Sequence, residues 1–568
     1  MAAGGSFLIE DQRASEVFTP EDLTEEHHAI ARAAREFFDK EVVPNVEAIV
    51  HGDRDLAISL LRKAASLGFE GILTPERYGG MELDLASSMV VAEELARDGS
   101  FAGWHGAHAG IGTMPLLLFG TEEQKQRYLP RLSHAELVAA YCLTEPHAGS
   151  DALAAKTRAD LTPDGRHYVL NGQKMWITNG GKADLFTVFA KVNGEQFTAF
   201  LVERAFPGVS SGNEEQKMGI KGSSTTAVYF DNVHVPVENL LGEIGRGHII
   251  AFNILNLGRL KLGPFAVGGS KNVLKVSLAY ARQRKAFGQE IANFGVIKHK
   301  LAEMAIRIFA LEAMSYRVEG LIQSQLAGFS WDDAEAPKRF MKAIEEFAAE
   351  CSMIKVYGSE VLDYVVDEGV QIHGGYGYHQ DYAVERAYRD SRINRIFEGT
   401  NEINRLLTTG MLLKRAQQGR LGLVKAAKAL MGEILSGAGG GDPAANAKKI
   451  ALLLLAAAFE KFGAAMDKEQ EVLSGIADVL MEAFAIESVS LRVEKTGKGA
   501  DLRDVFVRDA MTRIESSART VLAGCSEGDA LRSNLAVLRR FAKYDPINSI
   551  AIRRRIADGL LAAGHYVV

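Results

Sequence analysis

Residues 169–202 read VLNGQKMWITNGGKADLFTVFAKVNGEQFTAFLV, and they decide the fold class of a chain whose pattern is otherwise helical. Phe186–Lys191 and Phe197–Val202 are rich in aromatic and β-branched residues, as strands are. Turn dipeptides divide this part of the chain into short segments. They are Asp164-Gly165, Asn171-Gly172, Asn179-Gly180 and Asn193-Gly194. Residues 138–244 are therefore expected to form an antiparallel β domain.

Apolar residues at helical spacing precede and follow the β region. A Thr24 N-cap with acidic residues in the first turn predicts a helix up to about Val42, and further helices to about Leu137. Helical spacing resumes after Gly242–Gly247 and continues to about Lys414. The stretch SGAGGGDP at 436–443 predicts a linker within a last helical segment. We therefore expect a helical domain at 1–137, the β domain at 138–244, a helical bundle at 245–414 and a helical extension at 415–568.

Composition excludes several classes of protein. The chain has 568 residues, 47% of them apolar, which is typical of a large globular protein. Its net charge of −7 argues against DNA as a partner, because phosphate binding needs clustered positive charge. The longest apolar run, Ile450–Phe459, is far shorter than the roughly 20 residues that span a bilayer. The N-terminus lacks a signal or transit pattern, which predicts a cytoplasmic protein. The isolated Cys142, Cys351 and Cys525 predict buried thiols, with no disulfide framework and no metal site.

Common catalytic signatures are missing from the sequence. There is no GxxxxGK[ST], no HExxH and no GxSxG after a strand, which argues against P-loop, zincin and hydrolase chemistry. The glycine clusters at 242–247 and 437–441 do not form GxGxxG in a strand-turn-helix unit. Any cofactor is therefore expected to bind between domains.

Three segments carry candidate binding residues. Tyr141–Asp151, YCLTEPHAGSD, offers hydroxyls and backbone donors that can hold the polar edge of a planar ring. In KMWITNGG, Trp176 and Thr178 are expected on one strand face, although a core tryptophan before a turn is the simpler interpretation. Arg284 and the loop Gln371–Gly375 can supply a cation and backbone donors to a pyrophosphate, although a helical arginine is usually only solvated.

A fourth segment carries a candidate general base. Ile396–Ile403 reads IFEGTNEI and places Glu398 beside Phe397, just before a helix. Apolar surroundings raise the pKa of a carboxylic acid toward neutrality, which suits a base that removes a weakly acidic proton.

Taken together, the four segments resemble the acyl-CoA dehydrogenase family. The resemblance runs in order from about Leu23 to Gly410, through YCLTEPxAGSD, WITNGG, RKAFGQ, QIHGGYGY and RIFEGTNEI. It implies an α+β, mainly α fold: an N-terminal helical domain, a middle antiparallel β domain and a C-terminal four-helix bundle, with FAD between the last two. The extra helical C-terminal domain resembles the extension of the very-long-chain branch.

The resemblance assigns flavin contacts to the residues that match the family motifs. It implies that Tyr141, Leu143, Thr144, Gly149 and Ser150 line the flavin, and that Trp176, Ile177 and Thr178 cover its other edge. Contacts from a neighbouring subunit would come from Arg284, Phe287, Gln371, Gly374 and Gly375, which implies a homodimer. The adenine-nucleotide end would be held by Thr400 and Glu402.

The resemblance also implies the reaction. Glu398 would take the α-proton of a fatty acyl-CoA thioester, and FAD the β-hydride, to give a trans-2-enoyl-CoA in fatty acid β-oxidation. An electron-transferring flavoprotein would then reoxidise the flavin. Ser150, Gly399 and Arg259 would lie near the substrate, with Asn256 where many members carry Asp. Isovaleryl-type members place their base just before this arginine, at the position of Gly258, so Glu398 is left as the base. An acyl-CoA oxidase, a non-catalytic assembly protein and a nucleic-acid-associated branch of the same fold are the alternatives.

Two further expectations concern chain length and assembly. Small residues at Gly103, Ala107 and Gly110 predict a deep pocket for acyl chains of roughly twelve carbons or more, unless they only let helices approach. Two apolar stripes, Leu452-Leu455-Phe459 and Ile476-Val479-Leu480-Ala483, predict that the extension packs on the bundle of its own subunit and that assembly stops at a dimer. The basic run Arg553-Arg554-Arg555 is either a solvated helix face or a peripheral contact with anionic membrane.

Overall fold

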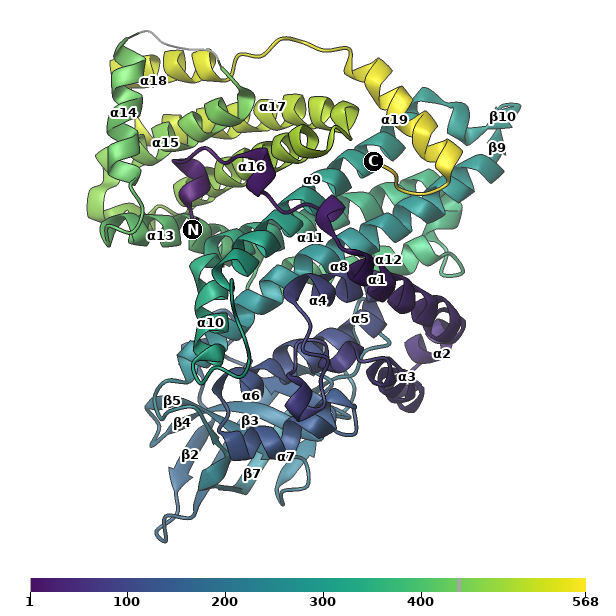
Figure 1. The fold of residues 1–568 in the computed structure, drawn as a ribbon, viewed down its shortest axis with the longest axis vertical. Coiled ribbons are helices and arrows are strands. Elements are labelled where there is room, and N and C mark those ends of the chain that lie inside the picture. The colour runs from purple at the N-terminus through teal and green to yellow at the C-terminus, as the bar shows by residue number, and fades with distance from the viewer. Residues whose placement is uncertain (1, 437–440) are drawn as a thin grey trace.

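The computed structural model describes residues 2–436 and 441–568. In Figure 1 the β domain lies at one end of the molecule, the extension at the other, and the long helices of the bundle between them. Part of the expected linker, residues 437–440, lies outside the described residues. Beyond it, Asp442 caps the next helix by accepting from the backbone N–H of Ala445, and Pro443 stands in the first helical turn, where it needs no hydrogen bond.

The N-terminal region is helical, as expected. Its helices are α1 (Glu25–Phe37), α2 (Val46–Val50), α3 (Arg54–Ser66), α4 (Leu85–Leu95), α5 (Gly99–His105), α6 (Met114–Phe119) and α7 (Glu122–Ser133). The predicted Thr24 cap is confirmed, because its side chain accepts from the backbone N–H of His27. A seven-residue π-helical segment, Gly106–Gly112, continues α5 and lines the site described below.

One eight-stranded sheet forms the middle domain. Its strands are β1 (Ala139–Cys142), β2 (Arg158–Leu161), β3 (His167–Thr178), β4 (Leu185–Val192), β5 (Gln196–Glu203), β6 (Val209–Ser211), β7 (Thr225–Pro236) and β8 (Leu240–Leu241). The strands predicted at 186–191 and 197–202 are confirmed as the antiparallel pair β4 and β5, joined at Asn193-Gly194 with both residues at positive φ.

The sheet departs from the expected pattern in two places. It is not purely antiparallel, because β1 and β2 lie one after the other along the same edge of β4 and run parallel to it. The chain between β1 and β2 is therefore an excursion away from the sheet. Asn171-Gly172 is not a turn but an irregularity inside β3, where a Cβ on Gly172 would lie 2.5 Å from Oγ1 of Thr157.

The bundle consists of long helices that pack side by side. They are α8 (Gly247–Gln283), α9 (Gly295–Gln325), α11 (Ala348–His373) and α13 (Asn401–Gln417), with the shorter α10 (Ala336–Glu346) and α12 (Ala383–Ser391) beside them. A small hairpin, β9 (Lys285–Ala286) and β10 (Gln289–Glu290), interrupts the helical pattern after α8. Cys142, Cys351 and Cys525 are free and buried, as expected.

The extension folds into α14 (Leu423–Leu435), α15 (Pro443–Phe462), α16 (Gln470–Thr496), α17 (Ala500–Cys525), α18 (Gly528–Phe541) and α19 (Ser549–Ala563). It packs on α9 and α13 of its own chain, as expected, and α19 returns across the bundle beside α9 (Figure 1). The predicted stripe from Ile476 to Ala483 is buried. The stripe predicted on α15 ends at Leu455, because Phe459 is 60% exposed in the last turn before the helix ends at Phe462.

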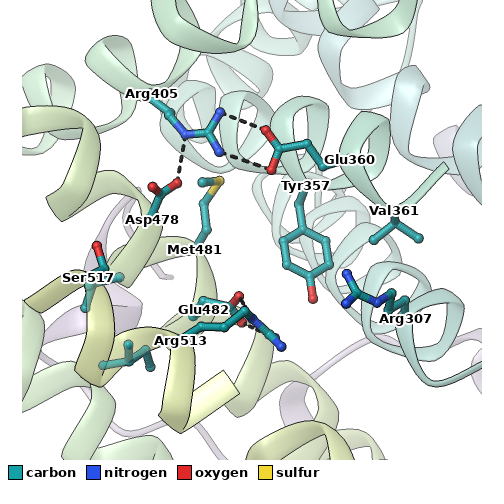
Figure 2. Close-up of a pocket in the computed structure, with 12 residues that line it drawn as sticks. Arg307, Tyr357, Glu360, Val361, Arg405, Asp478, Met481, Glu482, Arg513 and Ser517 are labelled. Carbon is teal, nitrogen blue, oxygen red and sulfur yellow. Dashed lines mark hydrogen bonds and ion pairs between the residues drawn. The ribbon is translucent and has the colours of Figure 1, made fainter. Parts of the chain in front are cut away.

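Paired charges fill the junction between bundle and extension. A cavity of about 290 Å³ lies there, and Figure 2 shows Arg405 of α13 between Glu360 of α11 and Asp478 of α16. In the same view Arg513 of α17 meets Glu482 of α16 at 2.5 Å. Because these cations already have anionic partners, we interpret the cavity as part of the domain junction.

Two of the three arginines in the basic run near the C-terminus form ion pairs within the chain. The run lies inside α19, and Arg553 is only 6% exposed and pairs with Glu303 of α9 at 2.5 Å. Arg555 pairs with Asp501 at 2.7 Å. These pairs leave little of the run for an anionic membrane. The expectation of a solvated helix face holds for Arg554 and Arg555, which are exposed, and is wrong for Arg553, which is buried against α9. Among the described residues, no helix is both long and apolar enough to cross a membrane.

The first twenty-odd residues contact the extension, which the sequence did not reveal. Phe7 packs edge-on against Phe484 of α16 with ring centroids 4.9 Å apart. Glu21 pairs with Arg492 of α16 at 2.8 Å, and Asp22 pairs with Lys495 at 2.5 Å. Figure 1 shows this segment crossing the extension and the bundle before α1 begins.

Candidate active site

A single cavity of about 1510 Å³ lies where the β domain, the N-terminal helices and the bundle meet. The excursion after β1, the end of β3, one face of α8 and the loop before α13 all contribute to its wall. It brings together thirteen of the predicted site residues. They are Tyr141, Leu143, Thr144, Gly149, Ser150, Trp176, Ile177, Thr178, Asn256, Arg259, Glu398, Gly399 and Thr400.

Glu398 occupies a strained and carefully held position in this wall. Its φ of 56° lies in the left-handed region, which costs a non-glycine residue about 1–3 kcal/mol. The backbone carbonyl of Glu398 accepts from Nε of Arg259 at 3.0 Å and from Nδ2 of Asn404 at 3.3 Å. Asn404 also donates to the carbonyls of Gly399 and Thr400, at 2.7 and 3.1 Å. These bonds hold the loop in a conformation in which Glu398 lines the cavity.

Glu398 is partly exposed to the cavity, but one oxygen of its carboxyl group is buried and has no hydrogen-bond donor. Oε2 has no partner among the described residues. Burial raises the pKa of Glu398 to about 7, while the cations Arg259 and Lys355 act in the opposite direction. The predicted rise toward neutrality is therefore confirmed, and its cause is desolvation. At neutral pH the group is divided between its charged and neutral forms.

Gly258 leaves the space into which Glu398 reaches. A Cβ at Gly258 would lie 2.8 Å from Oε2 of Glu398, so any side chain at Gly258 would collide with the Glu398 carboxyl group. Of the two positions at which a base was considered from the sequence, only Glu398 carries a carboxyl group, and the glycine leaves room for it.

Lys355, which sequence reasoning missed, lies behind this loop. Its ammonium donates to Oδ1 of Asn401 at 2.7 Å at the start of α13. Burial lowers the pKa of Lys355 to about 7, and the negative charge of Glu398 partly offsets that effect. The sequence gives little indication of this role, because it does not show whether a lysine in a helix is buried or exposed to solvent. A polar side chain at Asn401, one helical turn before Asn404, was the available clue.

The end of β3 does not have the regular geometry that the sequence suggested. Trp176 has a φ of 56° and lies at a register shift between Lys174 and Ile177, so strict alternation of faces fails there. The side chain of Trp176 is 61% exposed, so the alternative of a core tryptophan is wrong. Trp176 and Thr178 nevertheless both line the cavity.

Arg259 is held more tightly than a free substrate contact would be. Besides the carbonyl of Glu398, it donates to Oδ1 of Asn256 at 2.8 Å. It is only 4% exposed. In this chain Arg259 therefore fixes the Glu398 loop, and Asn256 fixes Arg259.

Six predicted residues lie away from this cavity. They are Arg284, Phe287, Gln371, Gly374, Gly375 and Glu402. Arg284 directly follows α8 rather than lying within it, and its guanidinium stands 5.7 Å from the ring centre of Tyr376, beside the Gly374–Tyr378 turn. Phe287 is 95% exposed. Except for Glu402, these are the residues that the resemblance assigns to a neighbouring subunit.

Comparison with known proteins agrees with the arrangement of motifs. Family models described as the acyl-CoA dehydrogenase N-terminal domain, middle domain and C-terminal domain match residues 24–136, 140–233 and 245–412. A further model, also described as an acyl-CoA dehydrogenase C-terminal domain, matches residues 446–540. The chain belongs to the acyl-CoA dehydrogenase family.

Individual relatives cover the chain to different extents. A crystal structure of an acyl-CoA dehydrogenase from Bacillus anthracis complexed with FAD is 48% identical, with a TM-score of 0.98 over 100% of both chains. A Bacillus subtilis protein named "Probable acyl-CoA dehydrogenase" is 48% identical over 100% of this chain and 98% of its own length. The very long-chain specific acyl-CoA dehydrogenase of Rattus norvegicus is 42% identical over 61% of this chain and 52% of its own length.

Proposed function

We propose that the protein catalyses the FAD-dependent α,β-dehydrogenation of fatty acyl-CoA thioesters to trans-2-enoyl-CoA. The observation that carries this proposal is the carboxyl group of Glu398. Its Oε2 atom is buried without a donor, its pKa is raised to about 7, and it lines a cavity whose wall also carries the flavin motifs of the family. Full-length relatives of the same family support it.

The chain's own groups account for the proton-transfer half of this reaction. Glu398 in its charged form removes the α-proton of the thioester, and its apolar surroundings make the protonated form that results stable. Arg259 and Asn404 keep the Glu398 loop from moving as the proton is taken. FAD, when bound, supplies the acceptor for the β-hydride. Closure of the cavity by the substrate excludes water from the reacting carbon atoms.

The residues present fit FAD. No atom lies within 4 Å of a Cβ placed on Gly149, Gly374 or Gly375, so the backbone at each is open to a ligand. Leu143, Thr144 and Thr178 line the cavity together with Gly149 and offer backbone and hydroxyl groups to the edge of an isoalloxazine ring. Thr400 lines the cavity too, although its hydroxyl also accepts from the backbone N–H of Ile403 at 3.3 Å as the cap of α13.

We propose that FAD is shared between two subunits, because Arg284, Phe287 and the Gly374–Gly375 turn gather at a surface away from Glu398. Arg284→Ala is expected to weaken FAD retention about tenfold while leaving the reduction rate of the flavin that stays bound nearly unchanged, since only a charge-assisted contact is lost. The measurement is FAD occupancy against protein concentration after dialysis, with light scattering to follow the expected dimer. Full occupancy in a monomeric Arg284→Ala preparation would contradict the shared site.

We further propose a preference for long acyl chains. Gly103 and Ala107 line the cavity, and Gly110 has open space where a Cβ would be, with no atom within 4 Å. Gly110→Leu should fill that space and shorten the preferred chain, with a cost of about fourfold in kcat/KM for each methylene displaced from the pocket. A series of acyl-CoA chain lengths measures this, with Gly432→Leu, which also has open space around it, as the control. A wild-type optimum at butyryl-CoA would contradict the proposal.

The electron acceptor that we propose is an electron-transferring flavoprotein, in the course of fatty acid β-oxidation. Anaerobic reduction by substrate, followed by reoxidation with air or with the acceptor protein, separates this proposal from an oxidase. Rapid reoxidation by oxygen alone would favour the oxidase. The absence of any substrate-dependent bleaching would favour a non-catalytic role.

A further inference from the structure

A second buried ammonium, that of Lys261, belongs to the wall of the active-site cavity. Lys261 lies on α8 three residues after Gly258 and four before Phe265, so these positions share one face of the helix. All three line the cavity, and Lys261 is only 5% exposed. Along the helix axis it stands about 4.5 Å beyond the glycine against which the Glu398 carboxyl group rests.

Lys261 lacks a partner in the described part of the chain. No carboxylate oxygen lies within 4.0 Å of its Nζ and no acceptor within hydrogen-bonding distance, whereas Arg259 is bonded to Asn256 and Lys355 to Asn401. The acidic group that influences it is Glu70. Oε1 of Glu70 is engaged by Nδ1 of His105 at 2.9 Å, and Oε2 of Glu70 has no hydrogen-bond partner among the described residues, so Glu70 acts on Lys261 as a nearby charge without a direct hydrogen bond. Burial lowers the pKa of Lys261 to about 8, so most of the side chain remains charged at pH 7.

A saturated hydrocarbon chain in direct contact with this ammonium is a poor neighbour for it, so the long methyl-ended chains proposed above must pass Lys261 without displacing its water. The methylenes of such a chain cannot accept a hydrogen bond, so a chain that displaces water from Lys261 leaves a buried charge unsatisfied. A carboxylate in the same place would accept a charge-assisted hydrogen bond and neutralise the ammonium. Leu262, Phe265 and Ala107, which line the same cavity, are apolar, and apolar walls strengthen such an attraction because they keep the local dielectric low.

We propose that Lys261 is a specificity-determining residue that binds a carboxylate at the far end of the acyl chain, so that the enzyme accepts acyl-CoA thioesters of dicarboxylic acids. The inference rests on the proposed dehydrogenation and names a substrate class for the same site. Glu398 would act at the thioester end, while Lys261 fixes the position of the opposite end and thereby selects the chain length among such substrates.

The experiment compares three thioesters at each of several chain lengths, ending in a methyl, a hydroxyl or a carboxylate. The holoenzyme and its Lys261→Met variant, which keeps the length of the side chain without the charge, are assayed for kcat/KM. For the wild type, we expect a chain length at which the carboxylate-ended substrate is used at least as well as the methyl-ended one. Lys261→Met should lower the ratio of carboxylate-ended to methyl-ended kcat/KM by about 10- to 150-fold and raise the methyl-ended value itself. Lys275→Met, an exposed lysine on the same helix, is the matched control and should leave the ratio unchanged.

Each arm has an outcome that overturns the proposal. If the wild type oxidises methyl-ended substrates but rejects carboxylate-ended ones at every length, the inference fails while the proposed function stands. If Lys261→Met leaves the ratio unchanged, or if the hydroxyl-ended substrate responds as strongly as the carboxylate-ended one, Lys261 does not select a carboxylate. If none of the three kinds of thioester bleaches the flavin of the wild type, the proposed function itself fails. Raising the pH through about 8 should reduce the carboxylate preference of the wild type, because Lys261 loses its charge.

Discussion

Glu398→Gln is expected to lower the rate at which an acyl-CoA substrate reduces the flavin by about 10²- to 10⁴-fold, the range that a positioned general base contributes. The amide keeps the shape of the side chain and can occupy the place beside Gly258, but it cannot accept the α-proton. FAD retention and substrate binding should persist, because Glu398 holds its loop through its backbone carbonyl rather than its carboxyl group. Stopped-flow bleaching of the flavin under anaerobic conditions measures the effect.

The pH dependence gives an independent check on the same residue. Burial raises the pKa of Glu398 to about 7, and only the charged form can take a proton. The wild-type reduction rate should therefore rise with pH through about 7, and this rise should vanish in Glu398→Gln. As a control, each preparation is matched for FAD content. Near wild-type bleaching by the variant would mean that another group is the base.

Much of the active site could be predicted from the sequence because its parts are short contiguous motifs. The loop that carries Glu398, the excursion after β1 and the end of β3 each lie within about ten residues, and all three meet at the cavity. The features that the sequence did not predict are those whose geometry depends on strands far away in the sequence. The register shift at Trp176 is set by pairing with β7, and the parallel direction of β1 and β2 by β4.

The missed cations show the same limit. Lys261 and Lys355 lie in helices whose sequences do not distinguish a buried lysine from one on a solvated face. Only the arrangement of α8, α11 and the loop before α13 reveals that Lys355 lies near Glu398 and that Lys261 lines the same cavity as Glu398. For the fold, helical spacing predicted that the extension packs on the bundle. Helical spacing gave no information about the N-terminal segment, because single side chains such as Phe7 and Glu21 hold that segment against α16.

A buried ion cluster centred on Glu487 of α16 is expected to control how firmly the extension docks. Glu487 accepts from Arg317 of α9 at 2.5 Å and also pairs with Lys448 of α15. Arg317 in turn donates to Oε1 of Gln12 at 2.6 Å, which ties the N-terminal segment into the same cluster. Glu487 is 5% exposed and Arg317 is 1% exposed. The charges are therefore poorly screened, and each depends on its partners for solvation.

Glu487→Gln should destabilise the protein by about 3–5 kcal/mol, because it leaves the cations of Arg317 and Lys448 buried without their shared counter-charge. The matched control is Glu515→Gln, which breaks the more exposed pair between Glu515 and Arg519 on α17 and should cost no more than about 1 kcal/mol. Denaturant unfolding measures both variants, and limited proteolysis should release the extension earlier from Glu487→Gln, since α16 carries the link to α9. If the two variants unfold at the same midpoint, the apolar contacts of Ile476, Val479 and Leu480 dominate docking and the ion cluster contributes little.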